Sequence, residues 1–259
     1  MKKDTILIKI GGAMAGQENM ILALASDMKK IAENYSFIIV HGGGAEVSAL
    51  SRHFGIEPKF VNGIRMTSSE EMKYVDQMLS GLINKRLVRL FYQEGFNAVG
   101  LTGSDGGCFI GEAIGLQGSE TNHTGKVRRV NPELLNRLLE DGFLPLLAST
   151  SMDEKGRPLN INADEAAFPI AMSLRAKSLV FLSDIPGILK DNQVLKTLSV
   201  SQAESEIQSG VIQGGMIPKV KSSIEALSGG VGEIIIGQFL KAGDLNSLIA
   251  GDAGSRIIQ

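Results

Sequence analysis

This sequence of 259 residues lacks clustered cysteines and histidines and lacks an excess of charge of one sign. Cys108 is its one cysteine, which excludes an internal disulfide and favours a small core residue in a reducing compartment. The three histidines have no spacing typical of metal ligands, so we expect no zinc site. The formal net charge of -2 gives no electrostatic basis for binding nucleic acid.

Long apolar runs are also missing. No stretch approaches the ~18 residues that a membrane-spanning helix needs. The apolar run at the N-terminus is too short for the core of a signal peptide and is interrupted by Lys9. We therefore expect a cytoplasmic protein with no membrane partner.

Two common catalytic motifs do not occur. The spacing G-x-x-x-x-G-K-[ST] of P-loop nucleotide-binding enzymes is missing. The G-x-S-x-G motif of serine hydrolases is missing too, and "GSDGG" (103–107) has no histidine placed to serve its serine. If the chain handles phosphates, it does so with another kind of loop.

Short apolar runs alternate with helical patterns along the whole chain. The runs that predict buried strands are 5–10, 37–40, 97–101, 144–148, 178–183 and 233–237. This alternation predicts an α/β fold with a mainly parallel sheet covered by helices on both faces. The length fits one large domain or two small ones.

One long helix is predicted over 69–94. Thr67 and Glu70 fit a capping box at its start, and Gly95 follows its end. Its apolar surface is larger than packing against one face of a sheet requires. Two roles for this surface remain open: packing in the core and contact with a second subunit. Residues 111–127 predict a hairpin or an exposed loop.

Glycines follow the first two predicted strands, as "KIGG" (9–12) and "HGGG" (41–44). Successive backbone N–H groups at the start of a helix bind anions without help from a side chain. Ligands of open α/β sheets bind beyond the carboxyl ends of the strands, where these corners lie. Either corner alone is equally typical of a tight turn, but two in succession indicate an anion site.

Polar side chains interrupt two apolar stretches. Lys9 stands in a buried strand, where it either extends to solvent at the strand end or meets a negative charge. In "LNINADEAAF" (159–168), Asn160 and Asn162 alternate as if on one face of an extended segment, and they are able to hydrogen-bond a polar ligand. Asp164 either caps the following helix or serves the site.

Two further stretches suit a nucleotide. Asp184 follows the strand at 178–183 and precedes a Pro-Gly turn, although such turns are common. The pair Gly214-Gly215 opens a helix that carries Lys219 and Lys221 in its first turns. Lysines there oppose the helix dipole unless a phosphate lies between them and the backbone N–H groups. The alternative is a solvated helix face, to which we assign Lys221.

Taken together, these stretches resemble the amino acid kinase family, and within it the branch that acts on N-acetyl-L-glutamate. "KIGG" and "SDIPG" types occur across the family, whereas "NGIRMT" after "HGGG", combined with "NINAD", is specific to that branch. The matching stretches run in order through the chain: "IKIGG" (8–12), "VHGGG" (40–44), "VNGIRMT" (61–67), "VGLTGSDGG" (99–107), "VNPELLNRLLEDGFLPLLAS" (130–149), "LNINADEAA" (159–167), "FLSDIPGIL" (181–189) and "GGMIPKV" (214–220).

The resemblance implies a fold and an assembly. The fold is a three-layer αβα sandwich of the carbamate kinase-like type, with a mainly parallel central sheet. An N-terminal lobe, 1–175, would bind the acyl-glutamate and carry the dimer contact, for which the helix at 69–94 is the candidate. A C-terminal lobe, 176–259, would bind ATP. The implied assembly is a homodimer that arginine does not inhibit.

The implied reaction is MgATP-dependent phosphorylation of the γ-carboxylate of N-acetyl-L-glutamate to N-acetyl-L-glutamyl 5-phosphate, a step of arginine biosynthesis. ATP and Mg²⁺ are the implied cofactors, with the metal carried on the nucleotide and no metal site in the protein. A γ-carboxylate is already ionised at pH 7, so no general base is needed. The protein has to position the reactants and stabilise negative charge on the transferring oxygens.

The resemblance also assigns roles to residues. Lys9 and Lys219 would approach the transferring phosphoryl group, and Asp164 would hold both lysines. Arg65 would bind the α-carboxylate, a task that suits a planar guanidinium. The other implied substrate contacts are Asn160, Gly43 and Gly44. The implied nucleotide contacts are Gly11, Gly12, Ser183, Asp184, Gly187, Ile188, Leu189, Gly214, Gly215 and Met216.

Two positions depart from the family pattern. Ser104 stands where many relatives carry a different, often charged residue, and Ser183 stands where threonine is common. Neither removes a predicted catalytic group.

Other functions remain open. A kinase for glutamate or aminoadipate linked to an acidic carrier protein would need a basic surface, for which "GKVRRV" (125–130) is the candidate. A non-catalytic, nucleotide-binding regulator on the same fold predicts damage at Lys9, Asp164 or Lys219, and all three are present. If the protein were a uridylate kinase or a carbamate kinase, the motif "NGIRMT" would have no role, which disfavours both activities. N-succinylglutamate stays open as a substrate.

Overall fold

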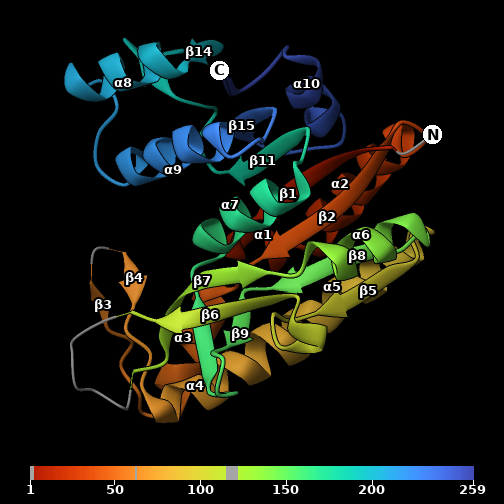
Figure 1. Cartoon of the computed structure of the whole chain (residues 1–259), viewed down its shortest axis with the longest axis vertical. Coiled ribbons are helices and arrows are strands. Elements are labelled where there is room, and N and C mark those ends of the chain that lie inside the picture. Colours follow the sequence, from red (N-terminus) through yellow and green to blue (C-terminus); the bar gives the residue numbers. More distant parts are fainter. Residues whose placement is uncertain (1–2, 62, 115–121) are drawn as a thin grey trace.

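A single large sheet forms the centre of the computed structural model, which describes residues 3–61, 63–114 and 122–259. Its strands are β1 (Asp4–Ile10), β2 (Tyr35–His41), β5 (Ala98–Leu101), β8 (Leu144–Ala148), β11 (Ser178–Ser183), β14 (Thr197–Ser199), β15 (Glu233–Gln238) and β16 (Ser255–Ile258). They lie in the order β14-β16-β15-β11-β1-β2-β8-β5 (Figure 1). All neighbours pair in parallel except β15 and β16. The six strands predicted from the apolar runs are confirmed.

Alternation along β1 explains how the sheet divides the core in two. Successive side chains of a strand point to opposite faces. Ile6, Ile8 and Ile10 are buried in the core on one face, and Leu7 is buried in the core on the other. Lys9 therefore lies on the same face as Leu7.

Helices cover both faces of the sheet, which makes three layers. The core that contains Leu7 includes buried residues of α6 (Pro132–Glu140), α7 (Ala163–Leu174), α8 (Val200–Gln208) and α9 (Met216–Ser228). The other core includes residues of α1 (Gly12–Ala15), α2 (Glu18–Ile31), α3 (Gly44–His53), α4 (Ser69–Asp76), α5 (Asn84–Gln93) and α10 (Asp244–Ala250). The predicted αβα sandwich is confirmed. No helix of the described ranges is both long and apolar enough to cross a membrane.

A second, smaller sheet lies in the lower half of the view, between α7 and α4 (Figure 1). Its order is β6-β7-β10-β9, built from β6 (Phe109–Ala113), β7 (Thr124–Val130), β9 (Thr150–Met152) and β10 (Pro158–Ile161). Two hairpins stand apart, β3 (Phe60–Val61) with β4 (Ile64–Arg65), and β12 (Leu189–Lys190) with β13 (Gln193–Val194). Strands β6 and β7 are antiparallel, so the hairpin alternative for 111–127 is confirmed where that stretch is described; 115–121 lies outside the described residues.

The long helix predicted over 69–94 is present, but its middle is not α-helical. A π-helical segment (Gln77–Ile83) lies between α4 and α5. The predicted cap is wrong by one residue, because the side chain of Ser68, not Thr67, accepts the N–H of Glu71. Thr67 is buried instead, where its own N–H donates to Thr124 Oγ1 at 2.9 Å.

Candidate active site

The two glycine corners meet at the carboxyl ends of β1 and β2. These strands are parallel neighbours, and Ile10 pairs with His41 just before the corners. A Cβ on Gly12 would lie 3.0 Å from the N atom of Gly44, so the two backbones are in contact. Helices α1 and α3 begin at these glycines. The free N–H groups of two helix starts are thereby gathered in one place.

Gly43 lies against the ends of two apolar side chains. A Cβ at this position would overlap Ile83 Cδ1 and would lie 2.8 Å from Leu79 Cδ2. Both side chains belong to the π-helical segment, which therefore packs directly against the second corner. A larger residue at position 43 would require these two side chains to shift.

A carboxylate bridges two lysines beside the corners. Asp164 Oδ1 lies 2.5 Å from Lys9 Nζ, and Asp164 Oδ2 lies 3.0 Å from Lys219 Nζ. Lys9 comes from β1, Asp164 from the first turn of α7 and Lys219 from α9, so three elements converge. Lys219 Nζ also lies 5.0 Å from the centre of the Phe181 ring, a cation–π contact.

The charge of this triad is fixed by mutual pairing. Burial by itself would raise the pKa of Asp164, but Lys9 and Lys219 outweigh that effect and the pKa lies below its ordinary value. The triad is thus one carboxylate with two ammonium groups, an excess of one positive charge. An incoming phosphoryl group would meet this excess.

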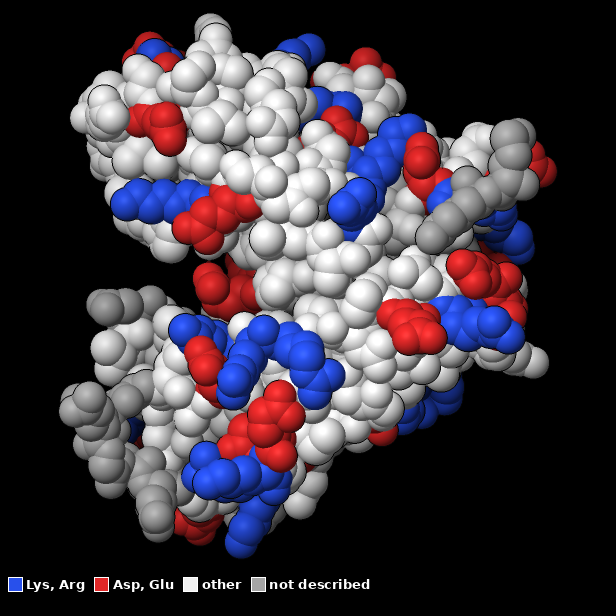
Figure 2. Space-filling view, in the orientation of Figure 1, with Lys and Arg blue, Asp and Glu red and all other residues white. Residues whose placement is uncertain are grey.

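One cavity of about 280 Å³ is lined by Lys9 and Asp164 of the triad, by the glycine corners and by Arg65. It lies on the notched side of the molecule in Figure 2, between α9 and the β3–β4 hairpin. Its lining residues are Lys9, Gly12, Gly42, Gly43, Gly44, Val47, Phe60, Gly63, Ile64, Arg65, Leu79, Thr124, Ser149, Asn160, Ile161, Asn162, Ala163 and Asp164. All the predicted substrate contacts therefore share one cavity.

The two asparagines of "NINAD" have different tasks. Asn160, on β10, donates from Nδ2 to Thr67 Oγ1 at 2.8 Å. Asn162 is the N-cap of α7, and its Oδ1 accepts the N–H of Asp164 at 2.8 Å. We expected both asparagines to present their amides to a ligand, and this is wrong for the Oδ1 of Asn162, which is used by the helix. The alternative that Asp164 caps α7 is also wrong, because Asn162 is the cap.

The predicted nucleotide contacts fall into a packed group and an open group. Ile188 is buried and its N–H donates to Ser255 Oγ at 2.8 Å, while a Cβ on Gly187 would lie 2.7 Å from the same oxygen. Gly214 and Gly215, at the start of α9, have no heavy atom within 4 Å of an added Cβ. The open pair leaves room for a ligand at that helix start, whereas Gly187 and Ile188 pack against β16.

His41, directly before the second glycine corner, is held by Asn84 from α5. Lys85 Nζ donates to Asn84 Oδ1 at 3.0 Å, which fixes the orientation of the amide. Asn84 Nδ2 then donates to His41 Nε2, also at 3.0 Å, so the ring is neutral and its Nδ1–H donates to Gly42 O. Sequence reasoning missed this support of the corner, because the two residues are 43 positions apart.

This buried histidine predicts a loss of stability in acid. Burial lowers the pKa of His41 from 6.5 to about 4, against the opposing hydrogen bond to Gly42. Between these two pH values the unfolded chain binds a proton that the folded chain excludes. The contribution of neutral His41 to the free energy of unfolding is therefore complete above pH 6.5 and falls below it. We expect the free energy of unfolding to fall by about 2 to 3 kcal/mol by pH 4.5 because of this group. Urea unfolding of the wild type and of His41→Gln should show their free-energy gap narrowing by that amount between pH 7.5 and pH 4.5; an unchanged gap would contradict it.

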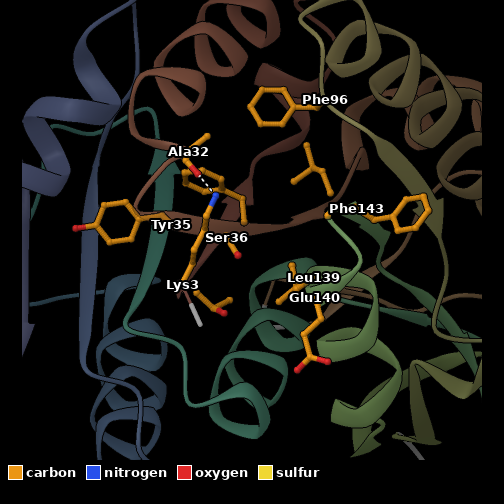
Figure 3. A pocket seen from close by; sticks show the side chains of 12 residues that line it. Lys3, Ala32, Tyr35, Ser36, Phe96, Leu139, Glu140 and Phe143 are labelled. Atoms are coloured by element: carbon orange, nitrogen blue, oxygen red, sulfur yellow. Dashed lines mark hydrogen bonds between the residues drawn. The ribbon is translucent and has the colours of Figure 1, made fainter. Parts of the chain in front are cut away.

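A different hollow, of about 470 Å³, lies at the amino ends of β1, β2 and β8 (Figure 3). Its lining is rich in aromatic rings, including Tyr35, Phe96 and Phe143, and Lys3 donates across it to Ala32 O at 2.6 Å. None of the predicted site residues lines it. The carboxyl ends of the strands are the expected ligand edge of such a sheet, so the cavity beside the triad is the candidate site.

Known proteins resemble this chain over nearly its whole length. Residues 4–238 match the Amino acid kinase family. A relative from Geobacillus kaustophilus (strain HTA426), named acetylglutamate kinase, is 37% identical over 233 residues, which cover 90% of this chain and 89% of that protein.

Solved structures agree on the fold. The protein smu.665 from Streptococcus mutans UA159 superimposes with a TM-score of 0.80 at 30% identity and covers 99% of both chains. A Giardia carbamate kinase superimposes with a TM-score of 0.71 at 17% identity and covers 100% of both chains. The second likeness shows the fold alone, and it confirms the carbamate kinase-like type.

Proposed function

The chain belongs to the amino acid kinase family, and we propose that it transfers the γ-phosphoryl group of MgATP to the γ-carboxylate of N-acetyl-L-glutamate. The observation that carries the proposal is the Lys9–Asp164–Lys219 triad, of which Lys9 and Asp164 line the same cavity as Arg65 and the glycine corners. The similarity to an acetylglutamate kinase along 90% of the chain supports it. The product would be N-acetyl-L-glutamyl 5-phosphate, an intermediate of arginine biosynthesis, made in the cytoplasm.

The acyl-glutamate would bind through its carboxylates. Arg65 and Asn160 would hold the α-carboxylate end, and the N–H groups of Gly43 and Gly44 would face the γ-carboxylate. An oxygen of that carboxylate forms a bond to the γ-phosphorus while the bond from phosphorus to the β-γ bridging oxygen breaks, and ADP leaves. No proton has to be removed, since the carboxylate is already ionised.

Lys9 and Lys219 would stabilise the charge that spreads over the transferring oxygens. Magnesium enters as part of the nucleotide substrate and neutralises phosphate charge. The described residues contain no group of three or more acidic, histidine or cysteine side chains suited to hold a metal.

We further propose that the two lobes bind different substrates. Residues 1–175 would bind the acyl-glutamate and form the dimer contact, and 176–259 would bind ATP. The nucleotide would lie along the open glycines that start α9 and the turn after β11. The proposed contacts are Gly11, Gly12, Ser183, Asp184, Gly187, Ile188, Leu189, Gly214, Gly215 and Met216, of which Ile188 could contribute little, because its side chain and N–H are already used.

The carrier-protein alternative would use the basic strand β7. Lys126 Nζ lies 3.1 Å from Glu112, and Arg129 lies 3.6 Å from Glu154. On this face of the molecule lysine and arginine are interspersed with acidic side chains (Figure 2). Two of the three cations of this strand are thus paired, and Arg128 is the third. Pairing weakens the attraction for an acidic partner, so the small-molecule substrate is favoured.

The proposal is tested by measuring ADP release with MgATP and four separate acceptors: N-acetyl-L-glutamate, N-succinyl-L-glutamate, free L-glutamate and UMP. Hydroxylamine is added to trap any acyl phosphate as a hydroxamate. Turnover with N-acetyl-L-glutamate, with hydroxamate formed, is the expected result. Turnover of N-succinyl-L-glutamate alone would change the acyl group, and ATP binding with no turnover on any acceptor would favour the carrier-linked substrate or the regulator.

The homodimer is tested at Leu82. This side chain, in the π-helical segment of the long helix, is 51% exposed although it is large and apolar. We expect Leu82→Glu to convert a dimer into a monomer in light scattering, because a charge would then be buried in the contact. Tyr92→Glu, further along the same helix, is the matched comparison for an exposed position. A Leu82→Glu dimer as stable as the wild type would rule out this contact.

A further inference from the structure

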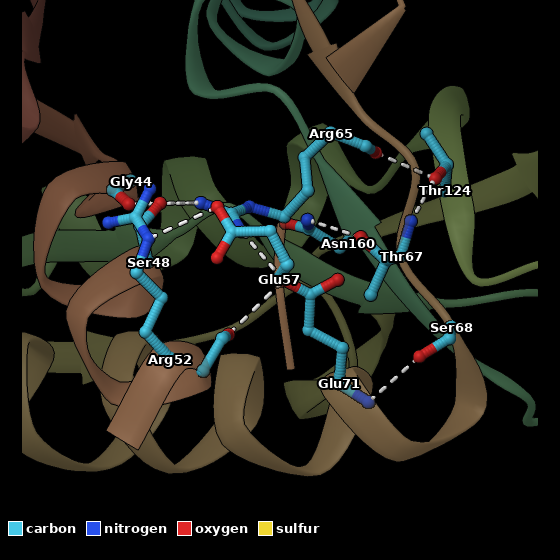
Figure 4. A network of polar contacts seen from close by, with 11 residues as sticks. Gly44, Ser48, Arg52, Glu57, Arg65, Thr67, Ser68, Glu71, Thr124 and Asn160 are labelled. Carbon is cyan, nitrogen blue, oxygen red and sulfur yellow. Dashed lines mark hydrogen bonds and ion pairs between the residues drawn. The ribbon is translucent and has the colours of Figure 1, made fainter. Parts of the chain in front are cut away.

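Arg65 and Glu71 form a buried ion pair at the edge of the candidate site (Figure 4). Arg65 Nη1 lies 2.6 Å from Glu71 Oε1, and both side chains are nearly inaccessible, at 8% and 2%. The pair is formed locally by the turn from β4 into α4, since the two residues are six positions apart. Charges buried to this degree need good geometry and additional hydrogen bonds to be tolerated.

Those hydrogen bonds come from α3. Ser51 donates from Oγ to Glu71 Oε1 at 3.1 Å, and Arg65 Nη2 donates to Ser48 Oγ at 2.6 Å. The serines are three positions apart on one helix and so lie on the same face. The ring of Phe60 covers the guanidinium with its centre 4.9 Å from Cζ. Both charged groups are thus held from several directions.

The same network ties Arg65 to the glycine corner. Arg65 Nη2 donates to the carbonyl of Gly44 at 3.0 Å. A guanidinium has five N–H donors, and these contacts with Glu71, Ser48 and Gly44 use three of them. Within the described residues the other two donors have no protein partner, and Arg65 lines the cavity. Both hydrogens of Nη2 are used, so the donors that remain are Nε–H and the second N–H of Nη1. They point in different directions, and each can donate one hydrogen bond to a carboxylate oxygen.

We propose that Glu71 is the positioning residue for Arg65: it fixes the plane of the guanidinium so that a remaining N–H group is presented to the α-carboxylate of the substrate. This inference rests on the proposed function and names a residue that decides how that substrate is held. Glu71 does not contact substrate in this arrangement. Its effect passes through Arg65, and it leaves the triad that serves the phosphoryl group untouched.

The opposite arrangement makes a different prediction. If Glu71 competed with the substrate for Arg65, its removal would free the guanidinium and lower the KM for N-acetyl-L-glutamate. The structure favours positioning, because Glu71 is itself fixed by Ser51 and because the guanidinium is also held by Ser48 and Gly44.

The test compares Glu71→Ala, Glu71→Gln and Glu70→Ala. Glu70 is exposed in the same first turn of α4, so its variant controls for the loss of a negative charge near that helix start. We expect Glu71→Ala to raise the KM for N-acetyl-L-glutamate about tenfold, a loss of one well-placed contact, with kcat and the KM for ATP changed less than about threefold. Glu71→Gln keeps an oxygen acceptor and should stay within about threefold of the wild type, as should Glu70→Ala.

An analogue without the α-carboxylate separates positioning from general damage. The wild type should prefer N-acetyl-L-glutamate over 4-acetamidobutanoate in kcat/KM, and Glu71→Ala should reduce that preference about tenfold. A structural lesion would lower both values together and leave their ratio unchanged, which would overturn the proposal. A lower KM in either Glu71 variant would overturn it in favour of competition.

A readout without turnover keeps this inference distinct from the proposed function. The side-chain N–H signals of Arg65, assigned by their loss in Arg65→Lys, should be individually resolved by NMR in the wild type and in Glu71→Gln. They should average in Glu71→Ala, because rotation of the guanidinium is then released. If the wild type turned over no acyl-glutamate, the proposed function would fail, while these signals would still decide whether Glu71 fixes Arg65; equal averaging in all three proteins would show that it does not.

Discussion

Lys9→Met is expected to lower kcat about 10³-fold while leaving the protein folded. Removing one preorganised donor to a developing charge costs on the order of 10² to 10³ in kcat, and Lys9 is proposed to donate directly to the transferring oxygens. Methionine fills a similar volume in β1 and carries no charge to desolvate, so the melting temperature should change by only a few degrees. ADP release with N-acetyl-L-glutamate gives kcat, and circular dichroism gives the melting temperature.

Lys221→Met is the matched control for this experiment. Lys221 lies on α9 two positions after Lys219 and is exposed, so its variant removes the same charge from the same neighbourhood without touching Asp164. Its kcat should stay within about threefold of the wild type. If Lys9→Met also retained kcat within about tenfold, the triad would not be the site of phosphoryl transfer.

Asp164→Asn is expected to lower kcat about 10²-fold or more. Asparagine keeps the shape of aspartate but cannot neutralise two ammonium groups, and its nitrogen would face one of them as a second donor. Lys9 and Lys219 would then repel each other, and one of them would lose the oxygen acceptor that holds it at 2.5 or 3.0 Å from Asp164. Because positioning of the charges carries this reaction, a small displacement is costly.

The control for Asp164→Asn is Glu165→Gln. Glu165 is the next residue in the first turn of α7 and is exposed, and its pKa lies above the ordinary value because of partial burial and the nearby charge of Asp164. Glutamine there removes a carboxylate from the same helix start but leaves both lysines paired. A loss of kcat in Glu165→Gln as large as in Asp164→Asn would mean that the helix start, and not the bridge between the lysines, matters.

Local sequence was sufficient for six strands of the large sheet, but it did not predict β14 and β16. A strand buried on both faces has to be apolar at nearly every position, and "TILIKI" and "SLVFLS" satisfy that requirement before any packing is known. The same requirement made Lys9 stand out, since an ammonium in such a strand is costly without an anion. The glycine corners were also evident, because glycine at the end of a strand is the residue that lets two backbones approach closely.

Other features were settled only by packing. Ser68, not Thr67, caps α4, because Thr67 is drawn into bonds with Thr124 and Asn160 from distant strands. Asn162, not Asp164, caps α7, because its Oδ1 accepts the N–H of Asp164. The alternation of Asn162 with Asn160 had indicated a role in ligand binding instead. Thr67 and Ser68 have similar capping propensities, and so do Asn162 and Asp164, so the local pattern could not choose between them.

The sequence by itself determined which residues are chemically unusual: a lysine in a buried strand, glycines at two corners, and an arginine in "NGIRMT". Only the tertiary structure decided what each of them meets. Lys9 and Asp164 are 155 positions apart along the chain, and Arg65 depends on Glu71, Ser48 and Gly44 from other elements. The reason is physical: local pattern reports the cost of burying a charge, whereas the partner that offsets the cost is chosen by how the elements pack.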